Sequence, residues 1–207
     1  MASEIPQTQT VALVHEQGGE VHFKDDYPVP TAGHNEVLAK VLYTGVCQSG
    51  QSASIHHQLQ LSERKKLTET DLHTKNGTSI GPTGHPITNI KLPHIGGHEG
   101  IGRIIALGPN CNTNPTQPEL KIGALVGIRF SSRVCRRCKF CLAGTEQYCV
   151  RGTNHLHHED GSFQEYIALD ADYLTLLPES VDERVMGPVL CAGLTAYKVL
   201  YSQCVRV

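Results

Sequence analysis

Tryptophan is absent from this chain of 207 residues, aromatic residues make up only 5%, and neither sign of charge dominates. A formal net charge of -2 offers no basic surface, so neither nucleic acid nor an anionic membrane is expected as a partner. No apolar run approaches the roughly 20 residues that a membrane helix requires. The polar start has no basic segment followed by an apolar one, so we expect a cytoplasmic protein without a secretory signal.

A dinucleotide-binding fingerprint is also absent. No Gly-x-Gly-x-x-Gly follows a strand-like segment, which excludes a dinucleotide-binding βαβ unit within these residues. The length allows one well-packed core, or one domain and part of another. We therefore expect that a nucleotide-cofactor domain is absent or only begun.

Short β-rich segments separated by Gly, Pro and Asn occupy most of the chain. They lie at residues 11–14, 21–23, 37–43, 101–107, 125–130 and 163–169. This punctuation predicts a mainly β fold with a few helices, arranged as an irregular β-barrel. Near the end, Ser180 is a candidate N-cap with acidic residues after it, and residues 187–200 are expected to be helical.

Eight cysteines are present, and without a secretory signal they favour metal binding over disulfides. Four of them share one short loop: Cys135, Cys138, Cys141 and Cys149. Zinc takes four tetrahedral ligands, so this loop predicts a closed structural zinc site without an open position for chemistry. A redox Cys-x-x-Cys pair or an iron–sulfur cluster is the alternative, but the bacterial ferredoxin spacing differs from this one. Basic residues beside the loop would offset the thiolate charge: Arg133, Arg136, Arg137, Lys139 and Arg151.

A second possible site is spread along the chain. Cys47, His98 and Cys191 would together supply three zinc ligands and leave a fourth position open, as catalytic zinc requires. Spacing alone does not establish this site, because a lone histidine or cysteine is more often an ordinary core or surface residue.

The run Gly97-His98-Glu99-x2-Gly102-x5-Gly108-x2-Cys111, with the four-cysteine loop and Cys191-Ala192-Gly193, resembles zinc-dependent alcohol dehydrogenases. The resemblance is to the fungal and yeast type of the medium-chain dehydrogenase/reductase superfamily. It implies a GroES-like catalytic domain over residues 1–178. Residues 179–207 would be a linker and first helix leading toward a Rossmann cofactor domain that is absent here or only begun.

The resemblance also implies site roles. Cys47, His98 and Cys191 would bind catalytic zinc, with Glu99 as a neighbour able to approach the metal. Ser49 and His73 match a proton relay, Asp71 an acidic residue that orients groups near the metal, and Cys111 a small apolar core position. With two zinc ions, the family oxidises small alcohols to aldehydes or ketones and transfers hydride to NAD. Its members are homo-oligomers, usually dimers or tetramers.

Residues 50–70 interrupt the family pattern. Removing them would join Ser49 to Asp71 and restore a continuous run, so they are an insertion between the two relay residues. A retained intron or mis-spliced message is one explanation, and a real exposed loop is the other. A long loop costs only a few kcal/mol in closure entropy, so the barrel would survive it.

The expected missing cofactor domain has a functional consequence. We predict that these residues alone bind up to two zinc ions but do not oxidise alcohol. Two other interpretations remain at this point: a non-catalytic zinc-binding GroES-like module or pseudoenzyme, and a zinc-free reductase of the same superfamily. The intact four-cysteine loop and the three catalytic-ligand matches argue against the zinc-free reductase.

Overall fold

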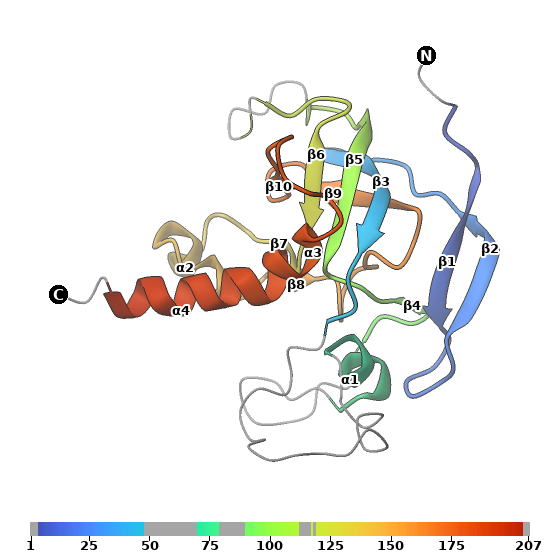
Figure 1. The fold of residues 1–207 in the computed structure, drawn as a ribbon, viewed down its shortest axis with the longest axis horizontal. Coiled ribbons are helices and arrows are strands. Elements are labelled where there is room, and N and C mark those ends of the chain that lie inside the picture. Colours follow the sequence, from blue (N-terminus) through green and yellow to red (C-terminus); the bar gives the residue numbers. More distant parts are fainter. Residues whose placement is uncertain (1–3, 48–69, 79–89, 112–116, 118, 205–207) are drawn as a thin grey trace.

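The computed structural model describes residues 4–47, 70–78, 90–111, 117 and 119–204 (Figure 1). Ser49 and almost all of the predicted insertion at residues 50–70 therefore lie outside the described residues. So does most of the Gly- and Pro-rich stretch that precedes residue 90.

A five-stranded antiparallel sheet forms the centre of the molecule. Its strands run in the order β10-β6-β5-β3-β9. They are β3 (Glu36–Thr44), β5 (Gly100–Leu107), β6 (Leu125–Ile128), β9 (Tyr166–Asp170) and β10 (Thr175–Leu176). Buried Val37, Ala39, Ile104 and Val126 belong to one apolar cluster beneath this sheet, as the alternation of side chains along a strand requires.

A smaller sheet lies beside the first, in the order β2-β1-β4. Its strands are β1 (Thr8–Val14), β2 (His22–Pro28) and β4 (His94–Ile95), and its core contains Val11, Leu13 and Ile95. A bridge between Val11 and Gln164 connects it to the segment before β9. A third pair, β7 (Ser131–Arg133) and β8 (Thr153–Asn154), flanks the cysteine loop.

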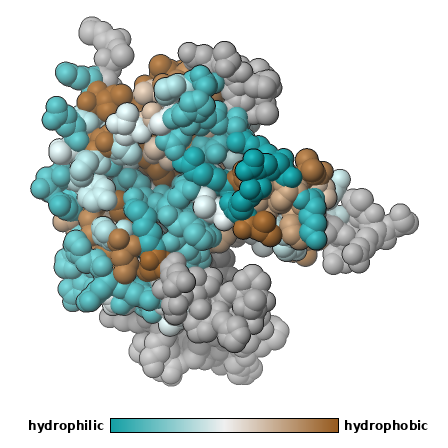
Figure 2. Space-filling view, turned by 180° about the vertical axis from the view of Figure 1, so that it is seen from behind, coloured by the Kyte–Doolittle hydropathy of each residue, from teal (hydrophilic) through white to brown (hydrophobic). Residues whose placement is uncertain are grey.

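Helices are short and lie at the edges. They are α1 (Thr70–Asn76), α2 (Lys139–Leu142), the 3₁₀ turn η4 (Glu146–Tyr148), α3 (Met186–Pro188), the π-helical turn η5 (Val189–Gly193) and α4 (Leu194–Cys204). The α4 helix projects from the body as an arm, with apolar side chains on its surface (Figures 1 and 2). None of the helices in the described residues is both long and apolar enough to cross a membrane.

The helix expected at residues 187–200 is present, but the prediction of Ser180 as its N-cap is wrong. Helical structure begins at Met186, after turns, and its N-cap position is Val185 without a side-chain hydrogen bond. Asp182 instead accepts hydrogen bonds from the backbone and the side chain of Arg184, a local turn that competes with helix initiation. The mainly β fold is confirmed, and the paired strands in the described residues are antiparallel, so this part contains no βαβ unit.

Gly108 allows two chain segments to meet closely at the end of β5. Its amide donates a 2.8 Å hydrogen bond to the Glu36 carbonyl, and an added Cβ would lie 2.7 Å from that oxygen and collide with the Gly33 carbonyl. Gly108→Ala is therefore expected to lower the free energy of unfolding by about 3 kcal/mol, because backbone cannot move aside as a side chain can. Urea denaturation measures the change.

The matched control is Gly193→Ala, where the nearest atom to an added Cβ is a valine methyl at 3.2 Å. Alanine is also favoured over glycine in a helix. An equal loss of stability in the two variants would contradict the argument from backbone approach.

Candidate functional site

One group of side chains that could hold a metal ion is buried where three separate segments meet. Cys47 follows β3, His98 and Glu99 lie between β4 and β5, and Cys191 lies in η5. One possible ligand atom from each of the four residues lies within 4.8 Å of every other. Burial is nearly complete for Cys47, His98 and Glu99 and partial for Cys191.

The distances in this buried cluster suit a tetrahedral metal. The sulfur atoms of Cys47 and Cys191 are 3.6 Å apart, and His98 Nε2 is 3.3 Å from Cys191 Sγ. Ligands at the usual zinc distances span roughly 3.6–3.8 Å along the edges of a tetrahedron. A disulfide would need about 2.05 Å, so the sulfurs are unbonded thiols. Two sulfurs and one imidazole nitrogen are a donor set that zinc accepts, and the residues therefore fit the metal.

Asp71, at the start of α1, holds three parts of this cluster together. One carboxylate oxygen lies 3.1 Å from His98 Nδ1 and accepts the Gly97 amide at 3.2 Å, and the other accepts the Cys47 amide at 3.2 Å. A carboxylate bonded to Nδ1 fixes the ring orientation and leaves Nε2 toward the metal position. The sequence-based role of Asp71 as an orienting residue agrees with these contacts.

Electrostatics in this cluster are dominated by burial and by one strong ion pair. Burial lowers the pKa of His98, but hydrogen bonds to Asp71 and Cys191 outweigh it and raise the pKa to about 11. Burial raises the pKa of Cys191, and His98 opposes that shift. Without a metal, the surroundings of His98 therefore stabilise its protonated, positively charged form. A divalent cation between the thiols and Asp71 would be stabilised by the same negative groups.

Two glycines permit the close approach of the segments around Glu99. The Gly45 amide donates a 3.0 Å hydrogen bond to the Glu99 carbonyl, and a Cβ on Gly45 would collide with the Glu99 side chain. A Cβ on Gly187 would lie 2.5 Å from the same carbonyl oxygen. The absence of side chains at Gly45 and Gly187 thus lets β3, the Glu99 segment and α3 converge on one point.

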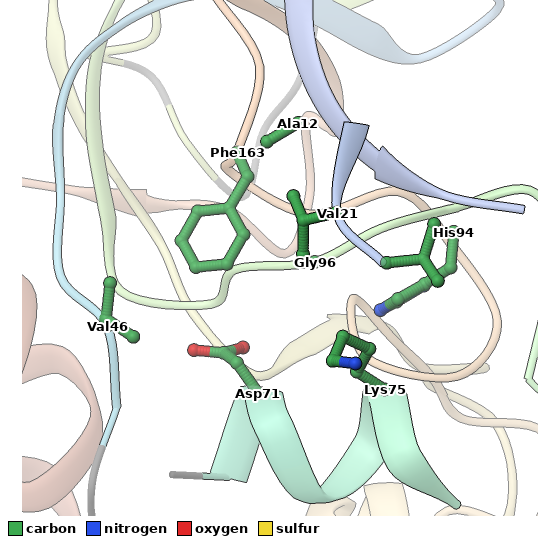
Figure 3. Close-up of a pocket in the computed structure, with 9 residues that line it drawn as sticks. Ala12, Val21, Val46, Asp71, Lys75, His94, Gly96 and Phe163 are labelled. Carbon is green, nitrogen blue, oxygen red and sulfur yellow. The ribbon is translucent and has the colours of Figure 1, made fainter. Parts of the chain in front are cut away.

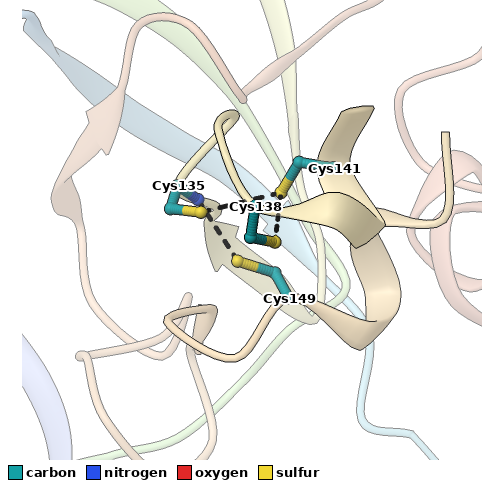
Figure 4. Close-up of side chains that lie close together, drawn as sticks. All are labelled: Cys135, Cys138, Cys141 and Cys149. Carbon is teal, nitrogen blue, oxygen red and sulfur yellow. Dashed lines mark hydrogen bonds between the residues drawn. The ribbon is translucent and has the colours of Figure 1, made fainter. Parts of the chain in front are cut away.

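The second group is the loop that contains Cys135, Cys138, Cys141 and Cys149 (Figure 4). Its four sulfur atoms also lie within 4.8 Å of one another, with 3.6 Å between Cys138 and Cys141 and 3.9 Å between Cys135 and Cys141. These separations bracket the roughly 3.8 Å edge of a zinc–thiolate tetrahedron. All four sequence-predicted ligands of this loop are thus brought together.

Backbone amides of the loop favour thiolates. The pKa of Cys135 falls to about 5, chiefly because the Arg137 amide donates to its sulfur and with help from the Arg151 side chain. Burial and the neighbouring cysteines, by contrast, raise the pKa of Cys141 to about 12. The cluster therefore does not readily lose all its protons together unless a cation compensates.

Two of the five basic residues near this loop, Arg133 and Arg136, pair with carboxylates and not with the cysteine sulfurs. Arg133 pairs with Glu36 and Glu159, and Arg136 pairs with Asp172, so the guanidinium groups of both arginines neutralise carboxylates. Only Arg151 is directed at a cluster sulfur in the described residues, through its hydrogen bond to Cys135. The ion pair between Arg133 and Glu36 connects the loop to β3.

Other predicted residues have mixed outcomes. His73 lies on α1, and its Nδ1 is 2.6 Å from Thr78 Oγ1, so its relay role stays a prediction. Cys111 is buried in the main core, as expected. Phe130 was not predicted from the sequence, because an isolated aromatic residue belongs to no motif. Its ring packs edge-on against His98, with centroids 6.1 Å apart.

Comparison with known proteins supports the family expected from the sequence. The profile of the alcohol dehydrogenase GroES-like domain matches residues 33–179. An alcohol dehydrogenase from Schizosaccharomyces pombe is 33% identical over 197 residues, which are 95% of this chain and 47% of that protein. The chain thus spans about half the length of this relative.

Solved structures share the fold. Acetophenone reductase from Geotrichum candidum, solved in complex with NAD, has a TM-score of 0.70 at 22% identity, covering 97% of this chain and 49% of its own. The cobalt- and zinc-bound alcohol dehydrogenase from Pyrobaculum aerophilum has a TM-score of 0.67 at 20% identity, covering 94% and 48%. The resemblance drawn from the sequence is confirmed, and this chain belongs to the alcohol dehydrogenase GroES-like domain family.

Proposed function

We propose that this chain supplies the zinc-binding, alcohol-binding half of an alcohol dehydrogenase that oxidises a small primary or secondary alcohol with NAD. The observation that carries the proposal is the buried cluster of Cys47, His98 and Cys191. Two thiols and an imidazole oriented by a carboxylate are three protein ligands, the number typical of a catalytic zinc site, whereas a closed structural site has four. The zinc-bound relative from Pyrobaculum aerophilum supports the choice of metal.

A metal held by Cys47, His98 and Cys191 would supply Lewis-acid activation of the alcohol. The protein's own part is positioning. Asp71 fixes the His98 ring and the backbone of Cys47, and its burial prevents water from weakening these hydrogen bonds. Phe130 packs against the His98 ring and limits its movement. Glu99 lies close enough to approach the metal, as the family resemblance implies.

Proton removal is proposed to pass through Ser49 and His73, the relay residues that the family resemblance implies. His73 Nδ1 lies 2.6 Å from Thr78 Oγ1, and Nε2 is the nitrogen proposed to exchange the proton. We propose that the chain by itself does not complete the reaction. Its sequence contains no dinucleotide fingerprint, and its described residues contain no βαβ unit to hold NAD.

Zinc analysis tests the proposal. The purified chain is expected to contain two zinc ions, and Cys191→Ser is expected to retain only one, because one of the two thiolates in the buried cluster is lost. The control is Cys111→Ser, which alters a buried cysteine outside both clusters and should leave two. One zinc in both the native chain and Cys191→Ser would favour the non-catalytic zinc module. NAD-dependent alcohol oxidation by the chain alone would contradict its proposed inactivity.

A further inference from the structure

A separate cavity lies between the small sheet and α1. Its volume is about 200 Å³, which is room for a molecule of several heavy atoms. Figure 3 shows its lining, which comes from β1, the β1–β2 connection, the segment after β3, β4 and α1. Its walls are apolar side chains: Ala12, Val14, Val21, Val46 and Phe163.

His94 lines this cavity, and nothing described so far accounts for burying its polar ring there. It lies on β4 directly opposite Val14 in the antiparallel pair, so both side chains face the cavity. The residue is only 2% exposed, and neither ring nitrogen has a hydrogen-bond partner within the described part of the chain. Leaving such a group unpaired costs about 1–3 kcal/mol, which indicates that something else satisfies it.

Charge in the cavity favours a neutral ligand. Asp71 and Lys75, one turn apart on α1, both line it, and their opposite charges offset each other (Figure 3). Asp71 is already engaged by the Cys47 and Gly97 amides and His98, and the Lys75 ammonium donates to the Gly19 carbonyl at 2.7 Å. Burial lowers the pKa of His94, although Asp160 and Asp71 oppose the shift, so the imidazole is uncharged at neutral pH.

A route from the surface is also present. An open groove of about 660 Å³ adjoins the cavity and shares four of its walls: Ala12, Val21, Val46 and Phe163. The outer part of the groove carries the exposed side chains of Phe23 and Tyr43. A ligand with an apolar tail could therefore leave its tail in the groove while its polar end reaches His94.

We propose that this cavity is a second ligand site, apart from the buried cysteine–histidine cluster, which binds a neutral alcohol through a hydrogen bond between its hydroxyl and His94. A hydroxyl suits either tautomer of the ring, because it donates to a bare nitrogen and accepts from a protonated one. The apolar walls accommodate the hydrocarbon part. A carboxylate is disfavoured because the Lys75 ammonium is offset by Asp71 and already donates to the Gly19 carbonyl. The site does not depend on the proposed dehydrogenase function.

The test is titration of the full chain with 1-pentanol, followed by NMR of the methyl groups of Val14, Val21 and Val46. Saturable shifts of these methyls are expected with pentanol, and none with sodium pentanoate. His94→Leu should weaken pentanol binding about tenfold, while His22→Leu, at an exposed position on β2, should leave it unchanged. Ala12→Leu, which places a larger side chain in the cavity wall, should abolish the shifts.

Two control measurements separate effects on folding and on the buried cluster from effects on the cavity. His94→Leu removes unpaired buried nitrogens, so its melting temperature should equal or exceed that of the native chain. Cys191→Ser alters the buried cluster but no wall of the cavity, and it should retain the pentanol-induced shifts. Undiminished affinity in His94→Leu, equal binding of pentanoate, or loss of the shifts in Cys191→Ser alone would each overturn the proposal. A saturable site that survives loss of the catalytic zinc would stand even if the dehydrogenase proposal failed.

Discussion

Cys141→Ser is expected to release one zinc ion and to disorder the loop between Cys135 and Cys149, while the barrel stays folded. The reason is that the loop has almost no apolar core of its own. Neither α2 nor η4 contains a buried residue, and Val150 just after the loop is 76% exposed. Structural zinc contributes roughly 10–16 kcal/mol of apparent binding energy in small zinc-binding peptides, so here the metal would be the main source of loop order.

Amide hydrogen exchange measures this effect site by site. Protection of the Leu142 and Ala143 amides, which donate to Cys138 and Lys139 carbonyls, should fall by at least about 100-fold, whereas protection in β3 and β5 should change little. Cys111→Ser serves as the control, since it replaces a cysteine of the core and leaves the loop untouched. Retained protection of the loop in zinc-free Cys141→Ser would show that hydrogen bonds alone maintain it.

Asp71→Ala is expected to weaken zinc binding at the buried cluster by 10–100-fold, the usual effect of removing a partner of a metal-binding histidine. It also removes the carboxylate that accepts the Cys47 and Gly97 amides, and loss of an acceptor from a buried amide costs about 1–3 kcal/mol. The free energy of unfolding should therefore fall by about 2–5 kcal/mol. Competition with a chromophoric chelator measures the zinc affinity, and urea denaturation measures the stability.

Asp71→Asn removes the negative charge of the side chain but keeps nearly the same size and shape. Its amide oxygen can still accept one backbone amide, so stability should fall less than in Asp71→Ala, yet zinc affinity should fall because the negative charge behind His98 is lost. Asp182→Asn, at an exposed turn outside both clusters, is the control and should keep two zinc ions. Native zinc affinity in Asp71→Asn would show that the carboxylate acts only on the fold.

Much of the fold could be predicted from the sequence because its short β-rich segments are separated by Gly, Pro and Asn. The strand-like segments at 37–43, 101–107 and 125–130 all correspond to strands of the main sheet. The helix start was misplaced because the hydrogen bonds of Asp182 to Arg184 satisfy a turn as well as they would a helix cap. Local patterns of this kind do not decide between the two outcomes.

The two candidate metal sites also differ in how far they could be predicted from the sequence. For the four-cysteine loop, the sequence by itself determined which residues come together, because ligands a few positions apart need little chain entropy to meet. For the buried cluster, Cys47 and Cys191 are 144 positions apart, so only the family resemblance pointed to them before the structure did.

Only the tertiary structure decided the rest. It showed that Asp71 carries three hydrogen bonds of the buried cluster, that Arg133 and Arg136 neutralise carboxylates instead of thiolates, and that His94 faces an apolar cavity unpaired. The physical reason is that hydrogen bonding, burial and charge pairing depend on which distant segments become neighbours. Spacing along a chain specifies a metal site when its ligands are local, and packing specifies it when they are not.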